Sequence, residues 1–293
     1  MKLIDGKEAS NAIRDKIKEE VAGLIDAGKR APHLAAILVG EDPASQTYVA
    51  NKEKSCQKVG ITSTLYRLPA ETTQDELLGV IDFINQDDEI DGVIVQLPLP
   101  DHIDKDTVIQ AIHPSKDVDG FHPENVGKMV SGLPTYLPAT PFGILMLLEH
   151  YKIETSGKSC AVLGRSNIVG TPMSLLLSRK ADPGNCTVTT VHSRSQNIEQ
   201  ITAEADIVVA AFGQPHYLKA DMVKDGAVVI DVGIHRVPSD KTKSGFRLIG
   251  DVDFDEVSKK ASWITPVPGG VGPMTITGLL MNTMKAYRKE VYS

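Results

Sequence analysis

The chain has 293 residues, of which 41% are hydrophobic, and it carries a formal net charge of -7. That length accommodates two domains of ordinary size, and the mildly acidic balance without a basic run argues against nucleic-acid binding. The N-terminus is too polar for a signal peptide and no apolar stretch approaches roughly 18 residues, so we expect no membrane association.

Cysteine usage indicates the redox compartment. The three cysteines, Cys56, Cys160 and Cys186, are odd in number and lack C-x-x-C spacing. This pattern favours a reduced, cytoplasmic chain with no metal site.

The first half of the chain alternates strand-like and helix-like segments. Predicted strands cover Leu34–Val39, Ile61–Leu68 and Gly92–Leu97, and predicted helices cover Asp42–Val59 and Thr73–Asn85. Asp42 followed by Pro43 is a typical helix start, and Gly60 is a typical stop.

A second series of alternating segments follows. Predicted strands cover Ala161–Leu163, Thr187–His192, Ile207–Ala210 and Ala227–Asp231; predicted helices cover Pro141–Tyr151 and Pro273–Glu290 and also begin at Ile168, Asn197 and Lys219. Alternating βα units predict an α/β fold with mostly parallel sheets. We expect one domain at 140–275 and another made of 1–139 with the C-terminal helix 276–293.

Tyr48 and Lys52 lie four residues apart on the first predicted helix and therefore share one face. A lysine that is removed from water can be neutral near pH 7 and can then transfer protons. The alternative is a solvated helix face, since Lys54 and Lys58 follow closely.

Two polar side chains follow predicted strands or turns. Gln96, in Gln96–Pro100, ends a strand that reads as buried, where side chains of parallel sheets reach bound ligands. Asp119, in Asp117–Gly120, is suited to accept paired N–H bonds from a guanidine-like ring edge. An ordinary strand exit and a plain turn are the alternatives.

A glycine turn follows the apolar run Ser159–Leu163. Gly164 opens it, Ser166 occupies the second glycine position of the common G-x-G-x-x-G pattern, and Gly170 follows six residues after Gly164. This order of strand, turn and helix places a dinucleotide pyrophosphate on backbone N–H groups. Many such turns need glycine for steric reasons alone, so the turn by itself establishes no nucleotide site.

Two further segments bear on ligand binding. The predicted strand over Thr187–His192 ends in Ser193 and Arg194, where NAD-specific sites usually place an acidic residue. An arginine flanked by serines can receive a 2′-phosphate, which favours NADP over NAD. The run Pro268–Thr275 is dense in glycine and lets backbone approach a flat ligand closely.

Together these motifs resemble those of the bifunctional methylenetetrahydrofolate dehydrogenase/cyclohydrolase family, from about Ile4 to Tyr287. The matching blocks are Pro43–Val49 with Lys52 and Lys54, then Gln96–Pro100, Asp117–Gly120, Gly164–Gly170 and Pro268–Pro273. The resemblance implies two α/β domains with the active site in the cleft between them. Residues 1–139 with 276–293 would form the folate-binding catalytic domain, and 140–275 a Rossmann-like NADP-binding domain.

The resemblance also implies the reaction and its residues. The chain would oxidise 5,10-methylenetetrahydrofolate with NADP and hydrolyse the product to 10-formyltetrahydrofolate, as a homodimer and without a metal. The catalytic residues would be Lys52 as acid/base, with Tyr48, Gln96 and Asp119. Further folate-binding residues would be Leu97, Pro98, Pro268, Gly269, Gly270, Val271 and Gly272. The NADP-binding residues would be Gly164, Arg165, Ser166, Ile168, Ser193, Arg194 and Ile234.

Two rival interpretations remain open at this stage. One is a monofunctional NAD-dependent methylenetetrahydrofolate dehydrogenase, which Lys52, Gln96 and Arg194 argue against. The other is a non-catalytic nucleotide-binding or scaffold protein on the same fold, which would not need these polar groups.

Overall fold

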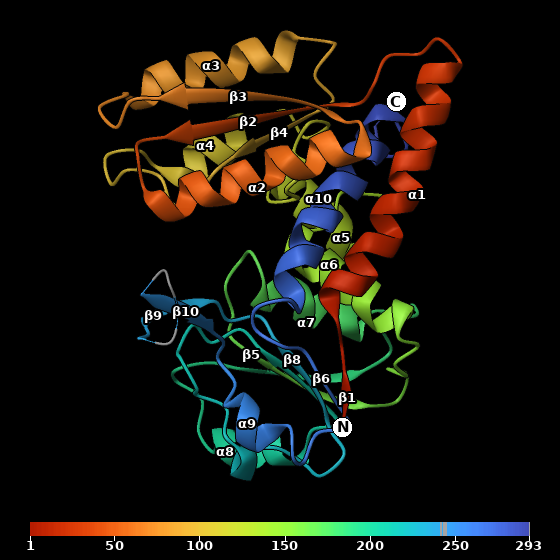
Figure 1. Cartoon of the computed structure of the whole chain (residues 1–293), viewed down its shortest axis with the longest axis vertical. Helices are drawn as coiled ribbons and strands as arrows, with labels where there is room; N and C mark the ends of the chain where they lie inside the picture. Colours follow the sequence, from red (N-terminus) through yellow and green to blue (C-terminus); the bar gives the residue numbers. More distant parts are fainter. Residues whose placement is uncertain (241, 243–244, 293) are drawn as a thin grey trace. The chain divides into compact units, whose positions relative to one another are not determined.

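A computed structural model of the chain describes residues 1–240, 242 and 245–292. The chain forms two compact units, Met1–Asn11 with Thr140–Thr275 and Ala12–Ala139 with Ile276–Ser293 (Figure 1). We name them the six-stranded unit and the three-stranded unit after their main sheets. The expected division placed residues 1–11 with 12–139. They belong instead to the six-stranded unit, because β1 (Lys2–Leu3) pairs with β11 (Trp263–Ile264).

The three-stranded unit has a parallel sheet in the order β3-β2-β4. Its elements are most of α1 (Gly6–Asp26), β2 (His33–Val39), α2 (Pro43–Val59), β3 (Thr62–Leu68), α3 (Gln74–Gln86), β4 (Gly92–Val95), α4 (Lys105–Ala111), α5 (Pro123–Val130) and most of α10 (Val271–Tyr287).

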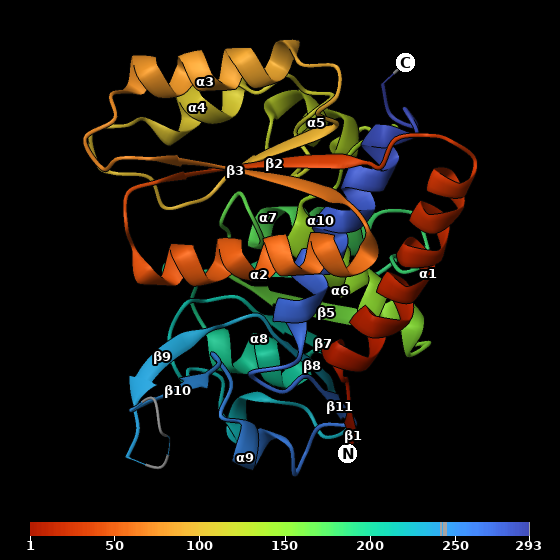
Figure 2. The same cartoon turned by 45° about the horizontal axis from the view of Figure 1, so that its top comes forward.

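The central strand β2 is covered on both faces. Figure 2 shows α3 and α4 on one face of the sheet and α2 on the other. Alternate β2 residues accordingly enter two different core clusters, with Leu34 on the α2 side and Ile37 on the α3 side. A strand buried on both faces reads as a continuous apolar run, which explains why β2 is evident in the sequence.

The six-stranded unit has a parallel sheet in the order β1-β11-β8-β7-β5-β6, and a separate antiparallel ribbon of β9 and β10. Its remaining elements are α6 (Ala139–His150, from Thr140), β5 (Ser159–Leu163), α7 (Gly170–Ser178), β6 (Thr187–Val191), α8 (Ile198–Glu204), β7 (Ile207–Ala210), a 3₁₀ turn at Ala220–Met222, β8 (Val228–Asp231), β9 (His235–Pro238), β10 (Phe246–Ile249) and α9 (Phe254–Val257).

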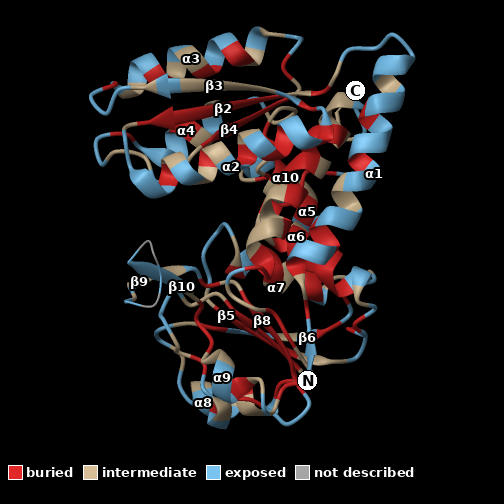
Figure 3. Ribbon diagram, viewed as in Figure 1, coloured by how far each residue is buried: buried red, intermediate tan, exposed pale blue. Residues whose placement is uncertain are grey.

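The strand order in this unit reverses at β5. β5 lies between β6 and β7, which follow it along the chain but pair with opposite sides of it. In doubly wound sheets, ligands bind at the carboxyl ends of the strands where the order reverses in this way. The strands themselves are buried, as the red interior ribbons of Figure 3 show. The core therefore fixes the position of the loops at that edge.

The sequence predicted the fold class and most of the long elements correctly, but it missed the short elements β1, α4, α5, β9, β10, α9 and β11. Three further differences concern helices. The helix expected from Lys219 is wrong, since only a 3₁₀ turn at Ala220–Met222 forms there. The helix expected from Ile168 begins at Gly170. Helix α1 was not predicted, although Ile13, Ile17 and Val21 repeat every four residues along it.

Candidate functional site

Tyr48 and Lys52 lie on the same face of helix α2, in the three-stranded unit. The helix start is fixed by Asp42, whose carboxylate accepts the Ser45 N–H at 2.7 Å. Only 7% of Lys52 is exposed, and Cys56, one further turn along, is fully buried. This face therefore points into the unit, and the alternative of a solvated Lys52 is wrong.

The amine of Lys52 contacts two of its predicted partners. Nζ lies 3.3 Å from Oε1 of Gln96 and 5.4 Å from the centroid of the Tyr48 ring. Burial lowers the pKa of Lys52, because the ammonium loses its hydration, and the charge of Asp119 opposes this effect. Burial thus favours the neutral amine, which is the form that accepts a proton.

The end of β4 fixes the side chain of Gln96. Its backbone N–H donates to the carbonyl of Ile37 at 2.9 Å, which extends the sheet by one residue. Its Nε2 donates to the carbonyl of Leu97 at 2.6 Å, so that Oε1 faces Lys52. The next peptide, Leu97–Pro98, is cis, and Pro98 is exposed.

Asp119 lies in a loop beside β4, held by a parallel bridge between Val93 and Asp117. The residue is half-buried. Burial raises the pKa of its carboxyl, whereas the positive charge of Lys52 acts to lower it. Leu97 and Asp119 line the same small cavity, of about 10 Å³.

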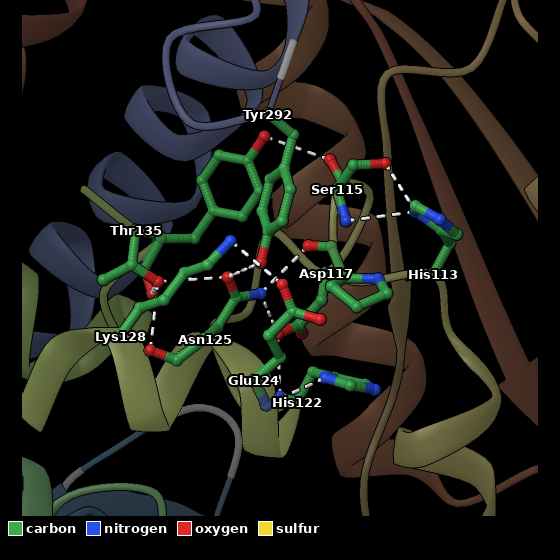
Figure 4. Close-up of polar contacts among 11 residues, drawn as sticks. His113, Ser115, Asp117, His122, Glu124, Asn125, Lys128, Thr135 and Tyr292 are labelled. Atoms are coloured by element: carbon green, nitrogen blue, oxygen red, sulfur yellow. Dashed lines mark hydrogen bonds and ion pairs between the residues drawn. The ribbon is translucent and has the colours of Figure 1, made fainter. Parts of the chain in front are cut away.

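Asp117 has a structural importance that the sequence did not indicate. It is 1% exposed, and its carboxylate accepts the N–H groups of Phe121 and His122 at 3.2 and 2.7 Å. It also accepts Nδ2 of Asn125 at 2.9 Å, within the polar cluster of Figure 4. Burial raises the pKa of Asp117 to about 7, although these three donors oppose the rise. Asp117 therefore organises the loop that carries Asp119.

In the six-stranded unit, the glycine turn joins β5 to α7. Gly164 has a φ of 117°, and a Cβ there would overlap the carbonyl oxygen of Ala211. A Cβ at Gly170 would overlap the carbonyl oxygen of Gly164. The hydroxyl of Ser166 accepts the N–H of Val169 at 3.2 Å. Both glycines are thus sterically required, and the turn they form lies at the sheet edge where nucleotides bind.

The predicted cofactor side chains around this turn are open to solvent. Arg165 follows β5, while Ser193 and Arg194 follow the neighbouring parallel strand β6, and all three are exposed. Because the two strands run parallel, these residues occupy one edge of the sheet. Two apolar side chains assigned to the cofactor, Ile168 and Ile234, are 43% and 51% exposed. The set can offer cationic groups to a phosphate and apolar faces to a ring.

The glycine-rich run precedes and opens α10 in the six-stranded unit. Gly269 has a φ of 111° and its carbonyl accepts the N–H of Lys7 at 3.1 Å. A Cβ at Gly270 would lie 2.6 Å from the carbonyl oxygen of Pro266, and one at Gly272 would lie 3.6 Å from Cδ1 of Ile234. The run thus passes beside a predicted cofactor residue. Gly270 leaves no room for a side chain, and the positive φ of Gly269 disfavours one.

Two buried aspartates, Asp231 and Asp251, hold the loops after β7 and β8 by hydrogen bonds to backbone N–H groups. The sequence did not predict these roles. Asp251 accepts the N–H groups of Phe212 and Gly213 at 2.6 and 2.8 Å, and His235 Nε2 lies 2.6 Å from its Oδ1. Asp231 accepts the N–H of Asp251 at 2.9 Å, and burial raises the pKa of Asp231 to about 7. The only sequence signal was the position of Asp231 at the end of an apolar strand.

The predicted residues form two sets within the units. Tyr48, Lys52, Gln96, Leu97, Pro98 and Asp119 lie in the three-stranded unit; Gly164, Arg165, Ser166, Ile168, Ser193, Arg194, Ile234 and Pro268–Gly272 lie in the six-stranded unit. Within the described ranges, no group of three or more His, Cys, Asp or Glu side chains is arranged to hold a metal ion. Among the helices of the same ranges, none is both long and apolar enough to cross a membrane.

Two family models match the chain. Residues 4–119 match the catalytic domain of tetrahydrofolate dehydrogenase/cyclohydrolase, and residues 138–291 match its NAD(P)-binding domain. The bifunctional protein FolD of Cytophaga hutchinsonii is 58% identical over 286 residues, which cover 98% of this chain and 99% of that protein.

Solved structures agree with this match. The bifunctional FolD enzyme of Campylobacter jejuni, a methylenetetrahydrofolate dehydrogenase/cyclohydrolase, superposes with a TM-score of 0.93 at 48% identity, covering 99% of both chains. The Trypanosoma brucei dehydrogenase-cyclohydrolase, solved with NADP and an inhibitor, also gives a TM-score of 0.93, at 39% identity, covering 99% of this chain and 98% of that one.

Proposed function

Since the chain belongs to the tetrahydrofolate dehydrogenase/cyclohydrolase family, we propose that its two sets of residues carry out the two reactions of that family. It oxidises 5,10-methylenetetrahydrofolate to the 5,10-methenyl cation with NADP. It then adds water to the cation and opens the ring to 10-formyltetrahydrofolate, with release of one proton. The observation that carries the hydrolytic half is the buried Lys52 amine beside Gln96.

The six-stranded unit has the features that NADP requires. The sterically forced turn between Gly164 and Gly170 joins β5 to α7 and lets the backbone approach a pyrophosphate closely. The exposed Arg194 beside Ser193 suits the 2′-phosphate that distinguishes NADP from NAD. When bound, NADP supplies the hydride acceptor, and the chain itself contributes position and charge.

Lys52 handles the proton in the hydrolytic step. As a neutral amine it takes a proton from the water that attacks the methenyl carbon, and it returns a proton to the ring nitrogen that leaves when the ring opens. Gln96 holds the amine through its Oε1, and Tyr48 covers it with its ring. The hydride step needs no such base, because hydrogen leaves with its electron pair.

The remaining residues bind and orient the folate. Asp119 accepts N–H bonds from the edge of the pterin, for which a half-buried carboxylate is suited. Apolar and backbone contacts to the folate come from Leu97, Pro98 and the run Pro268–Gly272. In this proposal the three-stranded unit is the folate-binding catalytic domain, and the six-stranded unit is the NADP-binding domain.

We further propose a cytoplasmic homodimer. The family resemblance supports the dimer, and three buried free cysteines, Cys56, Cys160 and Cys186, are compatible with a reducing compartment. Sedimentation velocity tests the oligomeric state, and a species with the mass of one chain at assay concentration would contradict the dimer.

A spectrophotometric assay tests the proposed function. The purified chain is supplied with 5,10-methylenetetrahydrofolate and either NADP or NAD, and reduced cofactor and methenyltetrahydrofolate are followed separately. We expect reduced NADP to form and methenyltetrahydrofolate to disappear by hydrolysis. Methenyltetrahydrofolate that accumulates to the level of the reduced cofactor would show a dehydrogenase alone, and faster turnover with NAD would contradict the cofactor assignment.

A further inference from the structure

The loop that carries Asp119 is held on both sides by backbone contacts. The carbonyl of Asp117 accepts the N–H of Gly120 at 3.1 Å, and the carbonyl of Asp119 accepts the N–H of Ala139 at 3.3 Å. The amide of Asn282, on α10, donates to the carbonyl of Val118 at 2.9 Å. With the N–H groups that Asp117 accepts further along, these bonds fix the backbone from which the Asp119 carboxylate extends.

Asn125, on α5, connects Asp117 to the rest of the unit. It is fully buried, and its Nδ2 donates to Asp117 Oδ2 at 2.9 Å and to the carbonyl of Pro114 at 3.0 Å. Its Oδ1 accepts the hydroxyl of Tyr292 at 2.8 Å, and the hydroxyl oxygen of Thr135 lies 3.0 Å from both Oδ1 and the backbone carbonyl oxygen of Asn125. Both ends of the amide are therefore engaged, as Figure 4 shows.

The orientation of this amide depends on its donors. If the Asn125 amide turned over, its carbonyl oxygen would face the carboxylate of Asp117, and two acceptors would oppose each other. The hydroxyl of Tyr292 opposes this by donating to Oδ1. It thereby helps to keep the Nδ2 group on Asp117.

Tyr292 comes from the segment after α10 and is itself held in place. The ammonium of Lys128 lies 3.5 Å from the centroid of its ring, and Lys128 also pairs with Glu124 at 2.9 Å. The ring of Tyr136 packs against it with centroids 5.9 Å apart. The C-terminal segment is thus part of the polar cluster behind the Asp119 loop.

From these contacts we infer that Asn125 and Tyr292 are positioning residues for folate binding, acting through Asp117 on the loop that carries Asp119. This inference rests on the proposed function and assigns it two residues outside the catalytic set. The C-terminal segment then affects affinity for the folate and leaves the NADP site unaffected.

The test uses the substitution Tyr292→Phe, which removes the hydroxyl and keeps the ring under Lys128. We expect the KM for methylenetetrahydrofolate and for methenyltetrahydrofolate to rise roughly 3- to 10-fold, which is the effect of one lost hydrogen bond. The kcat values and the KM for NADP should stay unchanged. Asn125→Ala should show the same pattern with a larger rise, roughly 10- to 100-fold.

Tyr136→Phe is the matched control. It removes a neighbouring hydroxyl, which donates to the carbonyl of Ser115 at 3.0 Å instead of to Asn125. We expect it to lower thermal stability without the change in folate KM. If Asn125→Ala does not fold, the folate KM of Tyr292→Phe alone tests the inference.

Three results would overturn the inference: an unchanged folate KM in folded Tyr292→Phe, an equal rise in the KM for NADP, or the same folate effect in Tyr136→Phe. If the wild-type chain does not oxidise methylenetetrahydrofolate, the proposed function fails separately. Calorimetric titration of wild type and Tyr292→Phe with tetrahydrofolate then decides the inference by affinity alone. A weaker affinity in the variant supports it, and equal affinities overturn it.

Discussion

The two units present their polar groups to ligands in opposite ways. In the three-stranded unit the ionisable side chains are withdrawn from water: Lys52 is 7% exposed and Asp117 is 1% exposed. In the six-stranded unit the two arginines predicted to bind the cofactor, Arg165 and Arg194, are exposed, and the glycine turn offers backbone for close contact.

This difference matches two kinds of chemistry. Burial shifts the pKa of an ionisable side chain before any substrate arrives, and so prepares Lys52 to move a proton. A cofactor that must bind and leave is better served by solvated charges and by a backbone cradle that needs no rearrangement. The buried Lys52 should therefore control the rate of the hydrolytic step, and the exposed arginines should control cofactor affinity.

The largest effect should follow the loss of the buried amine. Lys52→Met keeps the apolar stem and removes the proton carrier, so cyclohydrolase activity should fall by roughly 10²–10⁴. Dehydrogenase activity should survive in part, and methenyltetrahydrofolate should accumulate when the variant turns over with NADP. Loss of both activities in a folded variant that binds folate poorly would make Lys52 a binding residue.

A single methyl group added to the glycine turn Gly164–Gly170 should weaken NADP binding. In Gly170→Ala the new Cβ would overlap the carbonyl oxygen of Gly164, so we expect a loss of stability of about 1–3 kcal/mol and at least tenfold weaker NADP binding. Calorimetric affinity for tetrahydrofolate should remain. Gly79→Ala is the control, because a Cβ there meets nothing within 4 Å. Unchanged NADP affinity in Gly170→Ala would contradict the claim that this glycine turn binds NADP.

The exposed charge should change cofactor preference. In Arg194→Ala the KM for NADP should rise roughly tenfold to a hundredfold and the KM for NAD much less, because only NADP carries the 2′-phosphate. Lys180→Ala, another exposed cation of the same unit, should change neither value. Equal effects of Arg194→Ala on both cofactors would show that Arg194 does not contact the 2′-phosphate.

The sequence could predict the parts of the molecule whose signal is local. Tyr48 and Lys52 share a helix face by spacing alone, and Gly164 and Gly170 mark a turn after an apolar strand. The βα alternation was likewise sufficient for the fold class, since each buried strand reads as one apolar run.

Contacts between residues distant along the chain could not be predicted. Tyr292 reaches Asn125 across 167 positions, and no spacing rule connects them. The pairing of β1 with β11 moved residues 1–11 into the other unit for the same reason. At Lys219 the local pattern suggested a helix, but the chain returns to the sheet after one 3₁₀ turn.

The central claim is that burial makes Lys52 the proton carrier of the hydrolytic step, and the pH dependence of that step tests it most directly. The rate of methenyltetrahydrofolate hydrolysis is measured against pH for wild type and Lys52→Met, with uncatalysed hydrolysis subtracted. Because the neutral amine is the active form, kcat/KM should rise with pH to a plateau. The midpoint should lie below the ordinary lysine pKa of roughly 10.4, and Lys52→Met should lack the rise. A wild-type rate that falls as pH increases, or a rise that persists in Lys52→Met, would contradict the account.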